Sequence, residues 1–228
     1  MRRRAFGRSV GASLGAGWLA LSGGPLGAQA QPVLPALVAA AEQGDLPALQ
    51  RLLGAGTPVD QRDHRGRTAL LAATHANQVA AARLLIERGA DVNAKDSIQD
   101  SPYLYAGARG RLDILKLTLA AGADLASTNR YGGTALIPAA HYGHVDTVRE
   151  LLKTKIAVDH VNRLGWTALL EAVILGDGGP AHSEIVRLLL ATGADPNKPD
   201  GQGVTPLAHA DQRRQAAVAA LLRQAGAR

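Results

Sequence analysis

Two kinds of apolar pattern alternate along most of the chain. In the first, small and large apolar residues run together, as in residues 69–73, which read Ala-Leu-Leu-Ala-Ala. In the second, apolar residues return every three or four positions, as do the leucines of residues 46–53. A spacing of three or four residues places side chains on one face of a helix. The chain is therefore predicted to contain pairs of helices, an alanine-rich helix of about nine residues followed by an amphipathic one.

These helix pairs recur with a period of 33 residues, which must be recognised before any single element is assigned. The units open at Pro35, Thr68, Ser101, Thr134 and Thr167, and a sixth opens at Thr205 after 38 residues. The fifth unit thus has five extra residues, within 177–181. The predicted units lie near 35–67, 68–100, 101–133, 134–166, 167–204 and 205–228.

Residues at fixed places in the unit predict where each helix begins and ends. The opening Thr or Ser can cap the first helical turn with its side-chain oxygen. A glycine or asparagine stands ten residues into a unit, as at Gly44 and Asn77, and tolerates the left-handed backbone that ends a helix. The second helix ends at a glycine except in unit four, which has Lys155. The following stretch, such as residues 159–166, is rich in Asp, Asn and Gly and predicts a tight hairpin.

The 33-residue unit resembles the ankyrin repeat. Its openings are similar to Thr-Pro-Leu, Gly143-His144 stands between two helices, and residues 89–93, Gly-Ala-Asp-Val-Asn, follow a second helix. The resemblance covers residues 35–228 and implies an all-α repeat solenoid of six repeats, each a helix-turn-helix with a projecting hairpin loop. The first and last units are atypical, as expected for the ends of a solenoid. Pro138 departs from the pattern, but it falls in a first helical turn, where its missing amide removes at most one hydrogen bond.

Residues 1–30 have the order of a secretory signal peptide, and residues 31–228 are then the mature ankyrin-repeat domain. A basic segment, an apolar segment and Ala28-Gln29-Ala30 follow one another, which predicts cleavage after Ala30. The apolar segment is shorter than the roughly 20 residues that span a bilayer, so no membrane span is expected in the mature chain. A retained anchor is the alternative. Arg3-Arg4 resembles the core of a twin-arginine signal, which leaves that route and the general secretory route open. The protein is predicted to be periplasmic or secreted.

Charge and composition exclude several classes of function. The net charge of +6 falls to +2 without the four arginines of residues 1–30, and the remaining basic residues are scattered among acidic ones. No basic stripe is left to neutralise phosphates, so nucleic acid is not an expected partner. The chain has no cysteine, which excludes disulfides, Cys-ligated metals and a Cys nucleophile. No phosphate loop, dinucleotide fingerprint or nucleophile elbow occurs, and no cofactor is expected.

The histidines and recurring acidic residues are interpreted as structural. His141 and His144 are three residues apart, but no third ligand stands at a fixed spacing to complete a metal site. In the ankyrin family, a His after the helix-ending glycine bonds to neighbouring backbone. The Asp and Asn residues of the loops are expected to accept hydrogen bonds from their own backbone.

Tyrosine and tryptophan residues outside the N-terminal 30 residues occur only in units three and four. Tyr103 aligns with Leu70 and Leu136, which predicts a core position. Aromatic and arginine side chains on an exposed face commonly carry interface energy. The predicted partner-binding residues stand at positions that vary between units, and they are Ile98, Tyr105, Arg109, Tyr131, Tyr142, Arg163, Leu164 and Trp166. The alternative is that these tyrosines and the tryptophan pack across neighbouring hairpins and stiffen the stack.

The sequence therefore predicts a non-catalytic, monomeric protein-binding module or scaffold in the periplasm. The ankyrin resemblance implies that hairpin tips and a concave helix face contact another protein. Two alternatives stay open. One is a hydrolase-like enzyme with a site near the insert, at residues 177–182, and the other is an effector delivered to a host cell, which requires that the N-terminus is not cleaved.

Overall fold

Twelve α-helices, arranged as six pairs, make up residues 35–228, the part of the chain that this computed structural model describes. The helices are α1 (Ala36–Gln43), α2 (Leu46–Gly54), α3 (Ala69–His75), α4 (Val79–Glu87), α5 (Pro102–Ala108), α6 (Leu112–Ala120), α7 (Leu136–His141), α8 (Val145–Leu151), α9 (Ala168–Ile174), α10 (Pro180–Ala191), α11 (Pro206–Gln212) and α12 (Ala216–Gln224). This arrangement confirms the predicted all-α repeat fold. The predicted signal peptide, residues 1–30, lies outside the described residues. Within residues 35–228, no helix has both the length and the apolar character needed to cross a membrane.

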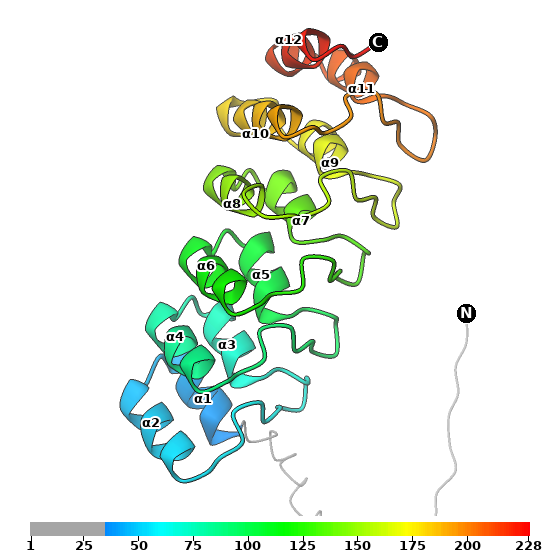
Figure 1. The fold of residues 1–228 in the computed structure, drawn as a ribbon. Helices are drawn as coiled ribbons and strands as arrows, with labels where there is room; N and C mark the ends of the chain where they lie inside the picture. The colour runs from blue at the N-terminus through cyan, green and yellow to red at the C-terminus, as the bar shows by residue number, and fades with distance from the viewer. Residues whose placement is uncertain (1–34) are drawn as a thin grey trace, which may run out of the picture. The chain divides into compact units, whose positions relative to one another are not determined.

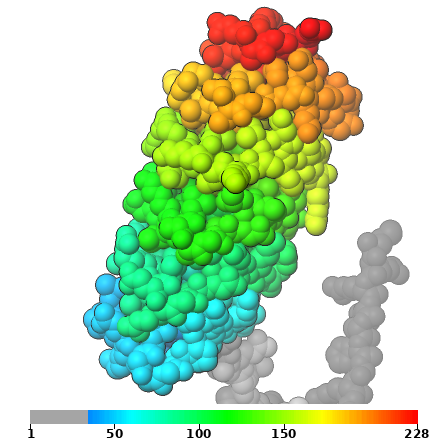
Figure 2. Space-filling view, viewed as in Figure 1, coloured from blue at the N-terminus to red at the C-terminus, as the bar shows by residue number. Residues whose placement is uncertain are grey.

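The helix pairs stack in chain order from α1 and α2 to α11 and α12 (Figure 1). The loops that join one pair to the next all project to the same side, next to the odd-numbered helices, and the even-numbered helices form the opposite layer. Substantial helix contacts occur within a pair or between adjacent pairs. The space-filling view shows the same order as successive bands of colour (Figure 2). Stability is therefore built from neighbouring units, as in other repeat arrays.

The opening Thr or Ser caps the first helix in most units. The side-chain oxygens of Thr68, Ser101 and Thr167 each accept a hydrogen bond from the amide three residues on, at 3.2 Å. Thr205 does the same at 3.3 Å. These first helices have six to eight residues, slightly fewer than the nine predicted, because the capping residue and the final turn are not helical.

Unit four lacks this cap because of Pro138. In the capped units, the backbone carbonyl of the opening Thr or Ser accepts a hydrogen bond from the amide four residues later, as Thr68 does from Ala72. Proline has no amide to donate. The carbonyl of Thr134 instead accepts from the amide of Ile137 at 3.2 Å, and the buried hydroxyl of Thr134 has no partner among the described residues. Pro138 thus costs the chain a cap, and α7 begins one residue late.

Left-handed residues end the helices where the sequence predicted them. Gly44, Asn77, Gly110 and Gly143 have φ between 57° and 73°. Lys155 has no such conformation, and α8 is correspondingly short at seven residues. Thr154 closes this end instead, because its hydroxyl donates to the carbonyl of Leu151 at 2.6 Å and accepts from the amide of Ile156 at 3.2 Å.

Each projecting loop is closed around one Asp or Asn side chain. Asn129 accepts from the amides of Tyr131 and Gly133 at 2.9 and 3.1 Å, and Asp63, Asp96, Asn162 and Asp200 repeat the pattern. Adjacent loops are also joined, as by the amide of Arg163 to the carbonyl of Tyr131 at 2.9 Å. The recurring acidic and amide residues are therefore structural, as predicted. Only Arg62 and Thr68 form a β-bridge among residues 35–228.

The core follows one position of the unit through the stack. Leu37, Leu70, Tyr103, Leu136 and Leu169 are at most 1% exposed, which confirms the core position predicted for Tyr103. The corresponding Leu207 of the last unit is only half-buried, since no helix pair within residues 35–228 lies on its outer side.

Candidate binding groove

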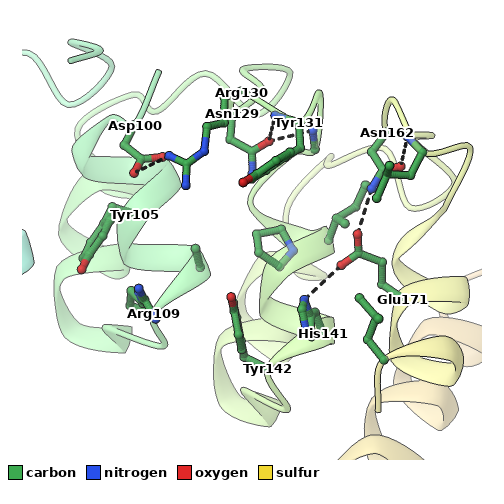
Figure 3. Close-up of a pocket in the computed structure, with 16 residues that line it drawn as sticks. Asp100, Tyr105, Arg109, Asn129, Arg130, Tyr131, His141, Tyr142, Asn162 and Glu171 are labelled. Carbon is green, nitrogen blue, oxygen red and sulfur yellow. Dashed lines mark hydrogen bonds and ion pairs between the residues drawn. The ribbon is translucent and has the colours of Figure 1, made fainter. Parts of the chain in front are cut away.

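A groove of ≈ 330 Å³ lies over units three to five, between the odd-numbered helices and the loops. Five of the eight predicted partner-binding residues line it, namely Tyr105, Arg109, Tyr131, Tyr142 and Leu164. Its other side chains include Asp100, Arg130, Pro138, His141, Asn162, Glu171 and Leu175, several of which point toward one another in the close-up (Figure 3). Residues 33 or more positions apart thus share one surface.

One wall of the groove is a row of aromatic rings with an arginine between them. Tyr105 on α5 stacks on His75 of α3, with ring centroids 3.8 Å apart. Tyr142, at the end of α7, stacks on His141 at 4.3 Å. The guanidinium carbon of Arg109 lies 5.7 Å from the ring centroid of Tyr105 and 5.8 Å from that of Tyr142. These distances fall within the range of cation–π attraction.

The loop side of the groove holds a second arginine, which is already paired. The Arg130 guanidinium lies 5.0 Å from the ring centroid of Tyr131 and 3.9 Å from the carboxylate of Asp100. Burial, followed by the nearby charge of Asp96, raises the pKa of Asp100.

The floor of the groove contains a buried carboxyl, Glu171 on α9. Its Oε1 accepts a hydrogen bond from Asn162 Nδ2 at 2.8 Å, and its Oε2 lies 3.5 Å from His141 Nδ1. Burial raises the pKa of Glu171 to about 7, against the opposing effect of the Asn162 hydrogen bond. Burial and the neighbouring His182 lower the pKa of His141. Both shifts favour neutral side chains, so the His141–Glu171 contact is not a full ion pair near pH 7.

Sequence reasoning missed the groove residues that interact across units. Glu171 occupies a helix position where the other units have Ala39, Ala72, Tyr105, Pro138 and His209, and its being the one acidic residue there was the available signal. The pairing of Arg130 with Asp100 crosses from one loop to the next. No feature of the local sequence indicates such a contact.

Three predicted partner-binding residues lie outside the groove. Ile98 is exposed on a loop tip. Arg163 joins two loops, because its Nη1 donates to the carbonyl of Arg130 at 2.8 Å. Trp166 is half-buried at the base of its loop, where its carbonyl accepts from the amide of Asn162 at 3.0 Å. Arg163 therefore links two loops by a hydrogen bond, whereas Tyr131 and Tyr142 are exposed.

The insert of unit five forms a structural link. His182 Nδ1 lies 2.9 Å from Asp177 Oδ1, and its Nε2 lies 2.9 Å from the carbonyl oxygen of His141 in the preceding unit. Gln78 and Gln215 reach preceding units in the same way, through the carbonyls of Glu42 and Val173. With both ring nitrogens engaged, His182 is not placed as a free general base.

The histidines do not converge on a metal site. His141 faces Glu171, whereas the His144 ring lies against the backbone near Ala108 and Gly110. No group of three potential metal ligands occurs within residues 35–228.

The stacked helix pairs with projecting loops define a helical repeat solenoid. The family described as "Ankyrin repeats (3 copies)" matches residues 18–96, 36–129 and 103–200. The chain belongs to the ankyrin repeat family, whose members are generally non-catalytic and typically bind proteins.

Several solved structures are similar to this chain. An ankyrin repeat domain from Acinetobacter baumannii AYE is 58% identical, with a TM-score of 0.82, over 84% of this chain and 98% of that one. The ankyrin repeat protein EF0377 is 43% identical, with a TM-score of 0.81, over 85% and 99%. The ankyrin repeat domain of Bcl-3, a member of the IkappaB protein family, is 27% identical, with a TM-score of 0.77, over 87% and 89%. No curated protein sequence matched the chain.

Proposed function

We propose that this ankyrin-repeat domain is a non-catalytic protein-binding module that works in the periplasm. Its partner binds to the groove and to the adjacent loop tips. One observation carries the proposal. Of the six large hydrophobic side chains that are exposed within residues 35–228, four line the groove, namely Tyr131, Tyr142, Leu164 and Leu175, and the other two are Ile98 and Val161. Exposed apolar side chains that gather on one region commonly mark a contact surface.

The exposure of the two groove tyrosines supports the same conclusion. The relative exposures of Tyr131 and Tyr142 are 56% and 51%, so a large part of each aromatic side chain is open to contact by a partner. Cation–π contacts with Arg130 and Arg109 hold them in place without covering them. Aromatic residues held in this way lose little entropy when a partner binds.

Site-specific photo-crosslinking tests the binding surface. A benzophenone amino acid at Tyr142 should crosslink to a discrete partner in cells. The same group at Lys116, exposed on α6 in the opposite layer, should not. Equal crosslinking from the two positions would contradict the proposed face.

Once the partner is captured, changing Tyr131 and Tyr142 together to Ala should weaken its binding by at least about 2 kcal/mol, the usual scale of an interface hot spot. Affinity is measured by titration calorimetry, and circular dichroism should show an unchanged helical signal because both side chains are exposed. Trp166→Ala is a useful comparison, since a half-buried residue outside the groove should affect stability more than binding. Unchanged affinity of the double variant would place the contact surface elsewhere.

Export is the second part of the proposal and rests on the order of basic, apolar and small residues in positions 1–30. N-terminal sequencing of protein from the periplasmic fraction should begin at Gln31 or within a few residues of it. Replacing Arg3-Arg4 by Lys-Lys should block export only if the twin-arginine route is used. A product that keeps residues 1–30 in every fraction would exclude processing and favour an effector or a retained anchor.

A further inference from the structure

Arg109 is the groove arginine that has no acidic partner. Arg130 is paired with Asp100, 3.9 Å away. No ion pair or side-chain hydrogen bond of Arg109 occurs within residues 35–228, although its side chain lies on the groove wall. Its guanidinium group therefore has its full set of donors available.

The surroundings of Arg109 hold its guanidinium group ready for an anion. The rings of Tyr105 and Tyr142 flank it, and each ring is itself backed by a stacked histidine, His75 or His141. A guanidinium group on an aromatic face is partly dehydrated and restricted, so it loses less freedom when it forms a bidentate contact with a carboxylate.

Neither acidic group of the groove forms an ion pair with Arg109. Asp100 lies 3.9 Å from Arg130, and Arg109 acts on it only as a more distant charge that lowers its pKa. Glu171 is buried and bonded to Asn162, and its raised pKa leaves it with less than a full negative charge near pH 7. One positive charge in the groove is therefore not neutralised, and the surrounding surface includes the exposed apolar side chains of Leu164 and Leu175.

We infer that the groove binds an extended segment of the partner protein that presents an Asp or Glu side chain to Arg109 and an apolar side chain to Leu164 and Leu175. This inference rests on the proposed protein-binding function and specifies its ligand.

A side-chain carboxylate fits better than the carboxylate of a chain terminus. Chain termini are commonly captured by a nest of free backbone amides. In this groove, the loop amides of Tyr131, Gly133 and Leu164 already donate to the side chains of Asn129 and Asn162. Arg109 offers side-chain donors only, and these suit an acidic residue within a continuous segment.

Selection from a library of random 12-residue peptides tests the inference. The full-length protein is the target, and parallel selections use Arg109→Gln and the control variant Arg83→Gln. Arg83 is an exposed arginine on α4, in the layer opposite the groove. Arg83→Gln changes the net charge by the same amount as Arg109→Gln but leaves the groove unaltered. Peptides selected on the unmodified protein and on Arg83→Gln should share an acidic residue next to an apolar one, and those selected on Arg109→Gln should not.

A thermodynamic cycle with one selected peptide then measures the contact. Replacing its acidic residue by the matching amide should weaken binding to the unmodified protein about tenfold, as for a charge-assisted hydrogen bond. The same replacement should change binding to Arg109→Gln by less than about twofold. The peptide is synthesised with a free and with an amidated C-terminus, and both forms should bind equally.

Four outcomes would overturn the inference. These are selected peptides without an acidic residue, an acid dependence that persists in Arg109→Gln, binding that requires the free C-terminus, and selection of no peptide at all, which would indicate recognition of a folded surface. Each outcome is distinguishable from failure of the proposed function, because crosslinking from position 142 to a partner can succeed in every one of these cases.

Discussion

Leu136→Ala should lower the free energy of unfolding by about 2–5 kcal/mol, the range for removing a fully buried leucine and leaving a cavity. Leu136 is 0% exposed at the start of α7, and units lie on both sides of it. The cavity left by the missing side chain would therefore be enclosed by protein and closed to water. The loss is measured by urea denaturation followed by circular dichroism. Leu169→Ala, at the same position of the next unit, should behave in the same way.

The matched control is Leu207→Ala. Leu207 occupies the same position in the last unit but is only half-buried, since no helix pair among residues 35–228 stacks on the outer side of α11 and α12. Its loss should cost clearly less than that of Leu136. Equal losses at the two positions would mean that burial between neighbouring units is not what stabilises the stack.

Glu171→Gln should stabilise the protein at pH 8 and leave its stability nearly unchanged at pH 4. The folded-state pKa of Glu171 is raised to about 7 by burial, from an ordinary value of 4.5. Between these two pH values the folded state holds a proton that the unfolded chain releases. The stabilisation from the protonated form is fully present below pH 4.5 and is lost as the pH rises through 7. The difference between the folded and unfolded pKa values of Glu171 corresponds to about 3 kcal/mol of stability that is lost by pH 8.

Urea denaturation of both proteins at pH 4, 6 and 8 checks this expectation. The unmodified protein should lose stability over this interval relative to Glu171→Gln, which has no ionisable group at that position but keeps an oxygen to accept from Asn162. Glu87→Gln, at an exposed position on the opposite layer, should follow the unmodified protein. If the free energy of unfolding changed with pH in the same way for all three proteins, Glu171 would not be held in its protonated form.

Local signals in the sequence were sufficient for the elements and their order. Thr68, Ser101 and Thr167 cap helices as predicted, and Gly44, Asn77 and Gly143 end them, because a cap or a left-handed residue acts on backbone groups a few positions away. The same reasoning underestimated Pro138. Its missing amide was expected to remove at most one hydrogen bond, but it also shifts the bonding of Thr134 and delays the start of α7.

The sequence by itself determined the period and the all-helical fold. It also pointed to five residues that line the groove, out of eight predicted to bind a partner. Each of these results follows from residues within one unit or from comparing units in register. Only the tertiary structure placed Arg109 between Tyr105 and Tyr142, and Glu171 beside both Asn162 and His141. It also showed that Arg163 joins two loops. Most of these contacts link side chains of different units, and their geometry depends on how each unit is rotated and displaced relative to the next. Packing across the whole interface between units sets that rotation, and no short segment of sequence contains it.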